Sequence, residues 1–159
     1  MTKKHRPALA PMCLRKLKSL DPELGKVGGQ FWTTVWGTER ALLPKHKYLI
    51  ALGMALAVGR DRQAARELIK AYGAGATLDE LRETFMLIPW NFGVSYFCSE
   101  VSTGTPMRAF ELIAELEKEG LTREEVMEQL KMRFRSQIGF KQQAEQERGD
   151  CAADRDKEA

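Results

Sequence analysis

One apolar segment constrains the fold of this chain more than any other feature. Between Pro44 and Gly59, the residues from Tyr48 to Val58 are almost all apolar. A helix that is apolar on every side is normally buried. The segment is too short to cross a bilayer, which needs about 20 residues. Because proline suits the first position of a helix, the segment predicts a buried helix that begins at Pro44.

Turn and capping residues place a second helix directly after the first. Gly59 ends the apolar segment, and Asp61 follows at a position suited to cap a new helix over 62–74. Gly75 then closes that helix. The connection at Gly59 is so short that the two helices must run antiparallel. The centre of the chain is therefore predicted to be an antiparallel helical hairpin.

A capping box marks the start of the next helix. Thr77-Leu78-Asp79-Glu80 has a cap residue followed three positions later by a glutamate. We expect a helix from residue 78 to about residue 100, kinked at Pro89 because proline removes a backbone hydrogen bond. Cys98 lies among aromatic residues near the end of this helix, and we expect it to be buried and inert.

Apolar residues at helical spacing also predict helices before and after the central region. Further helices are expected over 8–19, 21–36 and 105–119, and a last one follows the capping box at Thr122-Arg123-Glu124-Glu125. The glycines of the second helix would be tolerated if another helix packs closely there. No strand-like alternation occurs. The sequence predicts an all-α bundle of about six helices around the central antiparallel helical hairpin.

Length and charge limit the domain organisation. The 159 residues suit one domain, expected over 8–142, with a flexible basic arm over 1–7 and a disordered charged tail over 143–159. The net charge of +3 does not favour nucleic acid, although the arm leaves a phosphate or acidic partner open. We expect a cytoplasmic protein, because no secretory signal or membrane span is visible and the three cysteines are widely separated.

The central region resembles the carboxymuconolactone decarboxylase and alkylhydroperoxidase D-like (AhpD-like) family. The similar residues are Leu43-Pro44-Lys45, the apolar helix to Gly59, the segment Gly75-Ala76-Thr77-Leu78-Asp79-Glu80-Leu81, and Gly93. The resemblance implies a helical bundle that assembles as a trimer or hexamer. It also implies either thiol-dependent peroxide reduction, or decarboxylation and related proton transfers on lactones.

The catalytic positions of that family carry other residues in this chain. The peroxidase motif Cys-x-x-Cys-x-x-x-His falls on Arg60, Gln63 and Glu67, and the proton-relaying glutamate falls on Tyr48. Peroxide reduction by two cysteines needs a thiolate and a resolving thiol close together. We therefore reject that mechanism and expect acid–base chemistry without a metal or cofactor.

Glu67 and Tyr48 are the leading candidates for that chemistry. Counted from the turn at Gly59, their heights in the hairpin differ by only about one helical turn. We expect Glu67 to move a proton, Tyr48 or His46 to assist, and Arg60 or Arg66 to hold a substrate anion. The alternatives are that Glu67 is structural or solvated, and that His46, between two lysines, is a solvated surface group.

Aromatic residues supply candidate walls for a ligand pocket. The candidate substrate-binding residues near Pro89 are Trp90, Asn91 and Phe92, and Trp32 and Trp36 share one face of their helix. A bent core helix, and core or subunit-interface tryptophans, are the alternatives. Two functions thus remain open: a small-molecule acid–base enzyme of the decarboxylase or lyase type, or a non-catalytic oligomeric binding or scaffold protein.

Overall fold

A computed structural model describes residues 12–36 and 41–134, and it confirms the all-α prediction within these ranges. Eight α-helices and one π-helix occur there, and no strand does. Their bounds are α1 Met12–Leu20, α2 Pro22–Trp36, α3 Pro44–Ala57, α4 Asp61–Gly73, α5 Leu78–Phe92, α6 Val94–Tyr96, the π-helix Phe97–Val101, α7 Thr105–Lys118 and α8 Arg123–Arg133. None of the helices described is long and apolar enough to cross a membrane. The predicted arm over 1–7 and tail over 143–159 lie outside the described residues.

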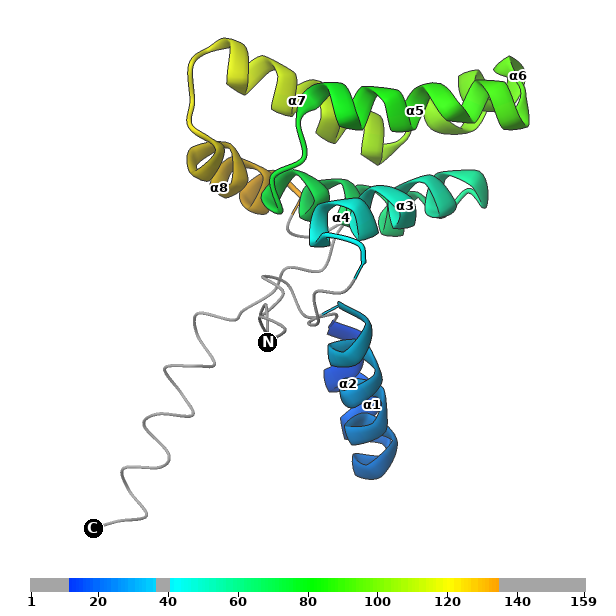
Figure 1. The fold of residues 1–159 in the computed structure, drawn as a ribbon, viewed down its shortest axis with the longest axis vertical. Helices are drawn as coiled ribbons and strands as arrows, with labels where there is room; N and C mark the ends of the chain where they lie inside the picture. The colour runs from blue at the N-terminus through cyan, green and yellow to red at the C-terminus, as the bar shows by residue number, and fades with distance from the viewer. Residues whose placement is uncertain (1–11, 37–40, 135–159) are drawn as a thin grey trace.

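The predicted central hairpin is present and consists of α3 and α4. Helix α3 begins at Pro44, and Gly59 makes the turn with φ of 65°, which an L side chain rarely adopts. Helices α3 and α4 form one layer, α5 and α7 form a second, and α8 packs at one end (Figure 1). Because it contacts α3, α5, α7 and α8, helix α4 is the centre of the bundle.

The prediction that the apolar helix would be buried on every side is wrong. Its inner face packs in the core, but Ile50, Met54 and Val58 on its outer face are each at least half exposed. Helix α4 is instead buried along most of its length, although it carries Glu67 and Lys70. Average hydrophobicity alone therefore did not identify the central helix, since burial depends on how many neighbouring helices surround it.

Asp61 does not cap its own helix as expected. It is the first residue of α4, and no side chain caps that helix. Its Oδ1 accepts a hydrogen bond of 2.7 Å from the backbone N–H of Thr105, at the start of α7. The carboxylate thus joins α4 to α7, which are neighbours in the bundle although 44 residues separate the two partners.

The helix expected over 78–100 is shorter than predicted. The Thr77 and Glu80 side chains form the predicted capping box, but α5 ends at Phe92, where Gly93 takes φ of 90°. The chain then continues as α6 and the π-helix. Pro89 lies within α5 and does not end it. The helix ends at Gly93 instead. Cys98 lies on the π-helix with its side chain exposed, which corrects the expected burial.

Helices α1 and α2 form an N-terminal hairpin that points away from the bundle (Figure 1). Glycines make the contact between them possible, as the sequence suggested. A Cβ on Gly25 would lie 2.4 Å from Lys18 Cα, and one on Gly28 would lie 3.0 Å from Leu17 Cδ2. At the end of α2, Lys47 Nζ of α3 donates to the Val35 carbonyl at 2.8 Å.

Replacing Gly25 and Gly29 of α2 by alanine should therefore change the stability of the hairpin in opposite directions. At Gly25 the new Cβ collides with the backbone of α1, and overpacking of this kind costs about 1–3 kcal/mol. At Gly29 nothing lies within 4 Å, so alanine should stabilise the helix by up to about 1 kcal/mol. Hydrogen exchange of the α1 and α2 backbone amides measures the change in stability caused by each substitution. Equal effects of the two substitutions would contradict the described contact.

Candidate functional site

An ion pair lies buried on α4. Only 4% of Glu67 and 7% of Lys70 is exposed. Lys70 Nζ lies 3.4 Å from each of the two Glu67 carboxylate oxygens, one helical turn away. Glutamate and lysine are almost never fully buried unless they are paired. Thr105 is the other buried polar residue among those that the structure describes, so a pair of opposite charges is an unusual feature of this core.

Two stacked aromatic rings lie beside this pair. The rings of Trp36, at the end of α2, and Tyr48, on α3, have centroids 4.9 Å apart and planes at 13°. Lys70 Nζ lies 5.9 Å from the Trp36 centroid and 5.6 Å from the Tyr48 centroid, within cation–π range. Three separate helices therefore position the four side chains, which we call the Glu67–Lys70 centre: Trp36, Tyr48, Glu67 and Lys70.

The phenol of Tyr48 is held in its neutral form. Burial raises its pKa to about 12, and the negative charge of Glu67 acts in the same direction. Lys70 Nζ is near both side chains, at 3.4 Å from the Glu67 carboxylate oxygens and 5.6 Å from the Tyr48 ring centroid. At neutral pH the Tyr48 hydroxyl can therefore donate a hydrogen bond inside the centre but cannot act as a base.

The two candidate arginines occupy different places. Arg66 Nε lies 3.3 Å from Glu67 Oε1, and the Arg66 side chain is about one-third exposed. Arg60 is exposed at the start of α4, seven residues before Glu67, which is about 10 Å along the helix. The structure thus brings Arg66, and not Arg60, to the carboxylate. Through Arg66 the buried pair connects to the surface.

His46 belongs to a different polar cluster. It is half-buried two residues before Tyr48, roughly 200° around the helix. The pKa of the Glu80 carboxyl lies below its usual value because Lys45 and the Thr77 backbone N–H donate to it, and the nearby His46 acts in the same direction. Lys45 Nζ lies 2.6 Å from Glu80 Oε1. His46 therefore lies near the start of α5 rather than in the Glu67–Lys70 centre.

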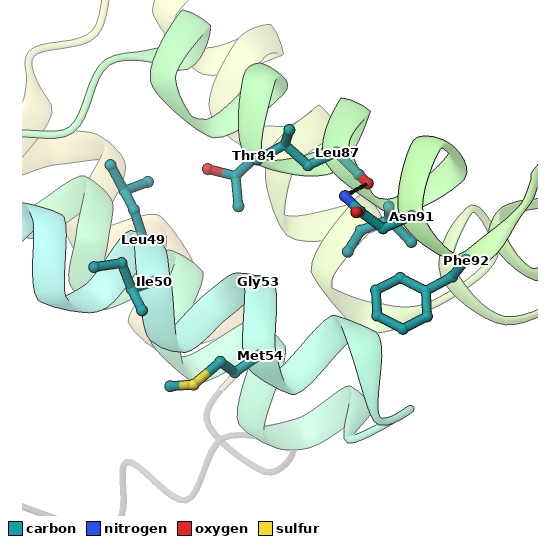
Figure 2. Close-up of a pocket in the computed structure, with 9 residues that line it drawn as sticks. Leu49, Ile50, Gly53, Met54, Thr84, Leu87, Asn91 and Phe92 are labelled. Carbon is teal, nitrogen blue, oxygen red and sulfur yellow. Dashed lines mark hydrogen bonds between the residues drawn. The ribbon is translucent and has the colours of Figure 1, made fainter.

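The residues predicted to line a ligand pocket also lie in different parts of the structure. A groove of about 410 Å³ lies between α3 and α5, and Asn91 and Phe92 line it together with Ile50, Met54 and Leu87 (Figure 2). Trp90 is 86% exposed on α5. Trp32 is half-buried in the N-terminal hairpin, whereas Trp36 belongs to the Glu67–Lys70 centre. These residues therefore do not surround one common pocket.

Neither groove described in the bundle opens on the buried pair. The second, of about 270 Å³, lies among Phe85, Pro89, Phe97 and Phe110 and is almost wholly apolar. Neither is lined by Tyr48, Glu67 or Lys70. Within residues 12–36 and 41–134, no three His, Cys, Asp or Glu side chains come together in a way that could hold a metal ion.

Sequence reasoning missed Lys70, the partner of Glu67. The signal was present, because Glu-x-x-Lys on a helix places the two charges on one face. Both residues also lie beside the buried alanines of α4. The sequence analysis assigned Tyr48 or His46 to assist Glu67, whereas the charged partner lies three residues further along α4.

Comparison of the chain with protein-family models, with curated proteins and with solved structures gives no significant match. The resemblance to the carboxymuconolactone decarboxylase family therefore remains a prediction based on the motif residues. The geometry of the Glu67–Lys70 centre stands independently of that resemblance.

Proposed function

We propose that this chain is a small-molecule acid–base protein of the carboxymuconolactone-decarboxylase-like type, working in the reducing cytosol, with the Glu67–Lys70 centre as its site. The observation that carries the proposal is the buried pair of opposite charges. Removing two charges from water costs several kcal/mol per ion, and a well-packed apolar pair often gives equal or greater stability. A charged pair at the centre of a bundle is therefore better explained by chemistry than by stability.

The side chains of the centre suit a decarboxylation or a related proton transfer. When a carboxylate leaves as CO₂, the bonding electrons pass into an enolate, and a proton must then reach the carbon. Positive charge from Lys70 and Arg66 would stabilise the enolate. Glu67 could receive a proton from Lys70 and give it to the carbon, after which solvent returns a proton to Lys70. The neutral Tyr48 hydroxyl could donate a hydrogen bond. The Trp36 and Tyr48 rings would help to exclude water.

The resemblance stated above adds support of a different kind. Glu67 stands where the family resemblance implies a catalytic histidine, and Tyr48 stands where it implies a proton-relaying glutamate. In this chain the negative charge of Glu67 contributes to the raised pKa of Tyr48. Peroxide reduction through two cysteines is not proposed, because Arg60 and Gln63 occupy the cysteine positions of the implied motif.

A thermal-shift screen tests this proposal. The wild type and Glu67→Gln are each mixed with carboxylated lactones, hydroxy acids and peroxides, and the ligand-induced change in Tm is recorded. Glu83→Gln, an exposed substitution on α5, is the matched control. We expect a lactone or hydroxy acid to raise Tm in the wild type and in the control but not in Glu67→Gln. Equal responses of Glu67→Gln and the wild type would remove the acid–base role.

The second candidate is a non-catalytic oligomeric binding or scaffold protein, assembled as a trimer or hexamer as the resemblance implies. A specific observation favours it: large apolar side chains are exposed on α2, α3 and α5, while neither described groove reaches the Glu67–Lys70 centre. A wild type that responds to no compound in the screen, but self-associates in solution, would favour this candidate over the enzyme.

A further inference from the structure

The outer surface of α3 and α5 is strongly apolar. We call it the α3–α5 face, and its side chains, each at least half exposed, are Ile50, Met54, Val58, Leu87, Trp90 and Phe92. Side chains of this size present on the order of 100 Å² each. Monomeric proteins rarely expose contiguous apolar patches larger than a few hundred Å². A face of this extent indicates that another surface covers it.

Each of the two polar side chains in the groove of this face makes a hydrogen bond within α5. The Asn91 side-chain amide donates to the Leu87 carbonyl at 2.8 Å (Figure 2). The Thr84 hydroxyl donates to the Glu80 carbonyl at 2.9 Å. The other side chains that line the groove are apolar. An apolar occupant, such as the face of a helix, matches this groove better than a polar small molecule.

The N-terminal hairpin carries a second uncovered apolar surface. Leu24, Val27, Phe31 and Val35 follow one another along the outward side of α2, and we call them the α2 stripe. Phe31 is 72% exposed. Helix α1 contacts α2 through Gly25 and Gly28 and leaves these four apolar side chains exposed. A two-helix hairpin with such a stripe in water lacks a core of its own, so the stripe also needs a partner.

The α2 stripe and the α3–α5 face match in length. The stripe extends over about 16 Å, and Ile50 to Val58 extend over about 12 Å of α3. In a reciprocal pair, each copy contributes the four side chains of its stripe and the six of its face, so each could bury on the order of 1,000 Å². Stable interfaces bury about 800 Å² per partner. The area is therefore sufficient for a stable reciprocal pair of copies.

The two surfaces are kept apart within one chain. The stack of Trp36 on Tyr48 and the hydrogen bond from Lys47 to Val35 fix the end of α2 at the start of α3. From there the N-terminal hairpin points away from the bundle (Figure 1). The stripe of one copy can, however, reach the face of another.

We propose that the α2 stripe of one copy docks in the groove of the α3–α5 face of a second copy. The contact joins two different surfaces, so it closes either as a ring or as a reciprocal pair of copies. It is independent of the acid–base proposal, because none of its side chains belongs to the Glu67–Lys70 centre. It gives the expected self-association a defined interface.

Two exposed substitutions and their mixture test the contact. Phe31→Asp alters the stripe, Met54→Asp alters the face, and Met132→Asp, equally exposed on α8 at 64%, is the control. Light scattering after size exclusion gives the mass of each, and circular dichroism confirms that each is folded. We expect an oligomer for the wild type and the control. Both test variants should associate roughly 30-fold or more weakly and approach the monomer mass of 18.0 kDa.

A mixture of the two test variants shows whether the α2 stripe is what occupies the groove of the α3–α5 face. A Phe31→Asp chain keeps an intact face and a Met54→Asp chain keeps an intact stripe, so an equimolar mixture should form a one-to-one dimer. A wild type that is monomeric at all concentrations would overturn the proposal. Dissociation by Met54→Asp alone, or a mixture that stays monomeric, would also overturn it, because the groove would then hold something other than the α2 stripe.

Discussion

Lys70→Met should lower the free energy of unfolding by about 3–5 kcal/mol, the usual cost of leaving a buried charge without its partner. Methionine fills a similar volume but supplies no positive charge within 3.4 Å of the Glu67 carboxylate. Arg66 remains as the other cation near that carboxylate, so the lower end of this range is expected. Denaturant unfolding at fixed protein concentration measures the change.

An exposed pair with the same spacing provides the control for this prediction. Lys131 Nζ lies 2.6 Å from Glu128 Oε1 on the surface of α8. Lys131→Met should cost less than about 1 kcal/mol, because solvent screens exposed pairs. The double variant Glu67→Leu/Lys70→Met should be close to the wild type in stability, since neither charge remains buried. A severe effect of the double variant as well would show that the pair serves stability.

Alkaline pH should remove about 3 kcal/mol of stability through Tyr48, because a tenfold difference in proton affinity between the folded and unfolded states is worth about 1.4 kcal/mol. Burial raises its folded pKa from the ordinary value of 10.0 to about 12. The contribution is therefore complete below pH 10, where both states keep the proton, and is lost as pH rises from about 10 to about 12. In that window the unfolded chain releases a proton that the folded chain retains.

Tyr48→Phe isolates this effect from the other groups that titrate at high pH. Tyr72 also has a raised pKa, through burial and its hydrogen bond to Glu117, and acts in the same direction. The quantity to compare is thus the slope of unfolding free energy against pH, for the wild type and for Tyr48→Phe. The wild type should fall more steeply above pH 10. Identical slopes would mean that the Tyr48 phenol is not desolvated.

Local signals in the sequence predicted local structure well. The capping boxes at Thr77 and Thr122 start α5 and α8, and Gly59 forms the turn of the central hairpin. Each depends on hydrogen bonds or backbone conformations within a few residues, so no distant neighbour is needed. By contrast, Asp61 looked like a local cap but bonds to Thr105, which sequence spacing could not indicate.

The candidate site was only partly predictable for a related reason. The heights of Tyr48 and Glu67 in a helical hairpin follow from counting residues, and the two positions are indeed electrostatic neighbours. Burial of Lys70 depends instead on how α2, α3 and α4 surround one point in space. The same limit applies to α3, whose apolar sequence gave no sign that Ile50 and Met54 would face outward.

The ligand response of the Glu67→Leu/Lys70→Met double variant tests the central claim most directly. The claim is that this buried pair is present for chemistry on a small molecule. The thermal shift produced by carboxylated lactones and hydroxy acids is measured for the wild type and for the folded double variant. We predict that at least one compound raises the Tm of the wild type and that none raises the Tm of the double variant. Equal shifts in both proteins, or no shift in the wild type, would contradict the claim.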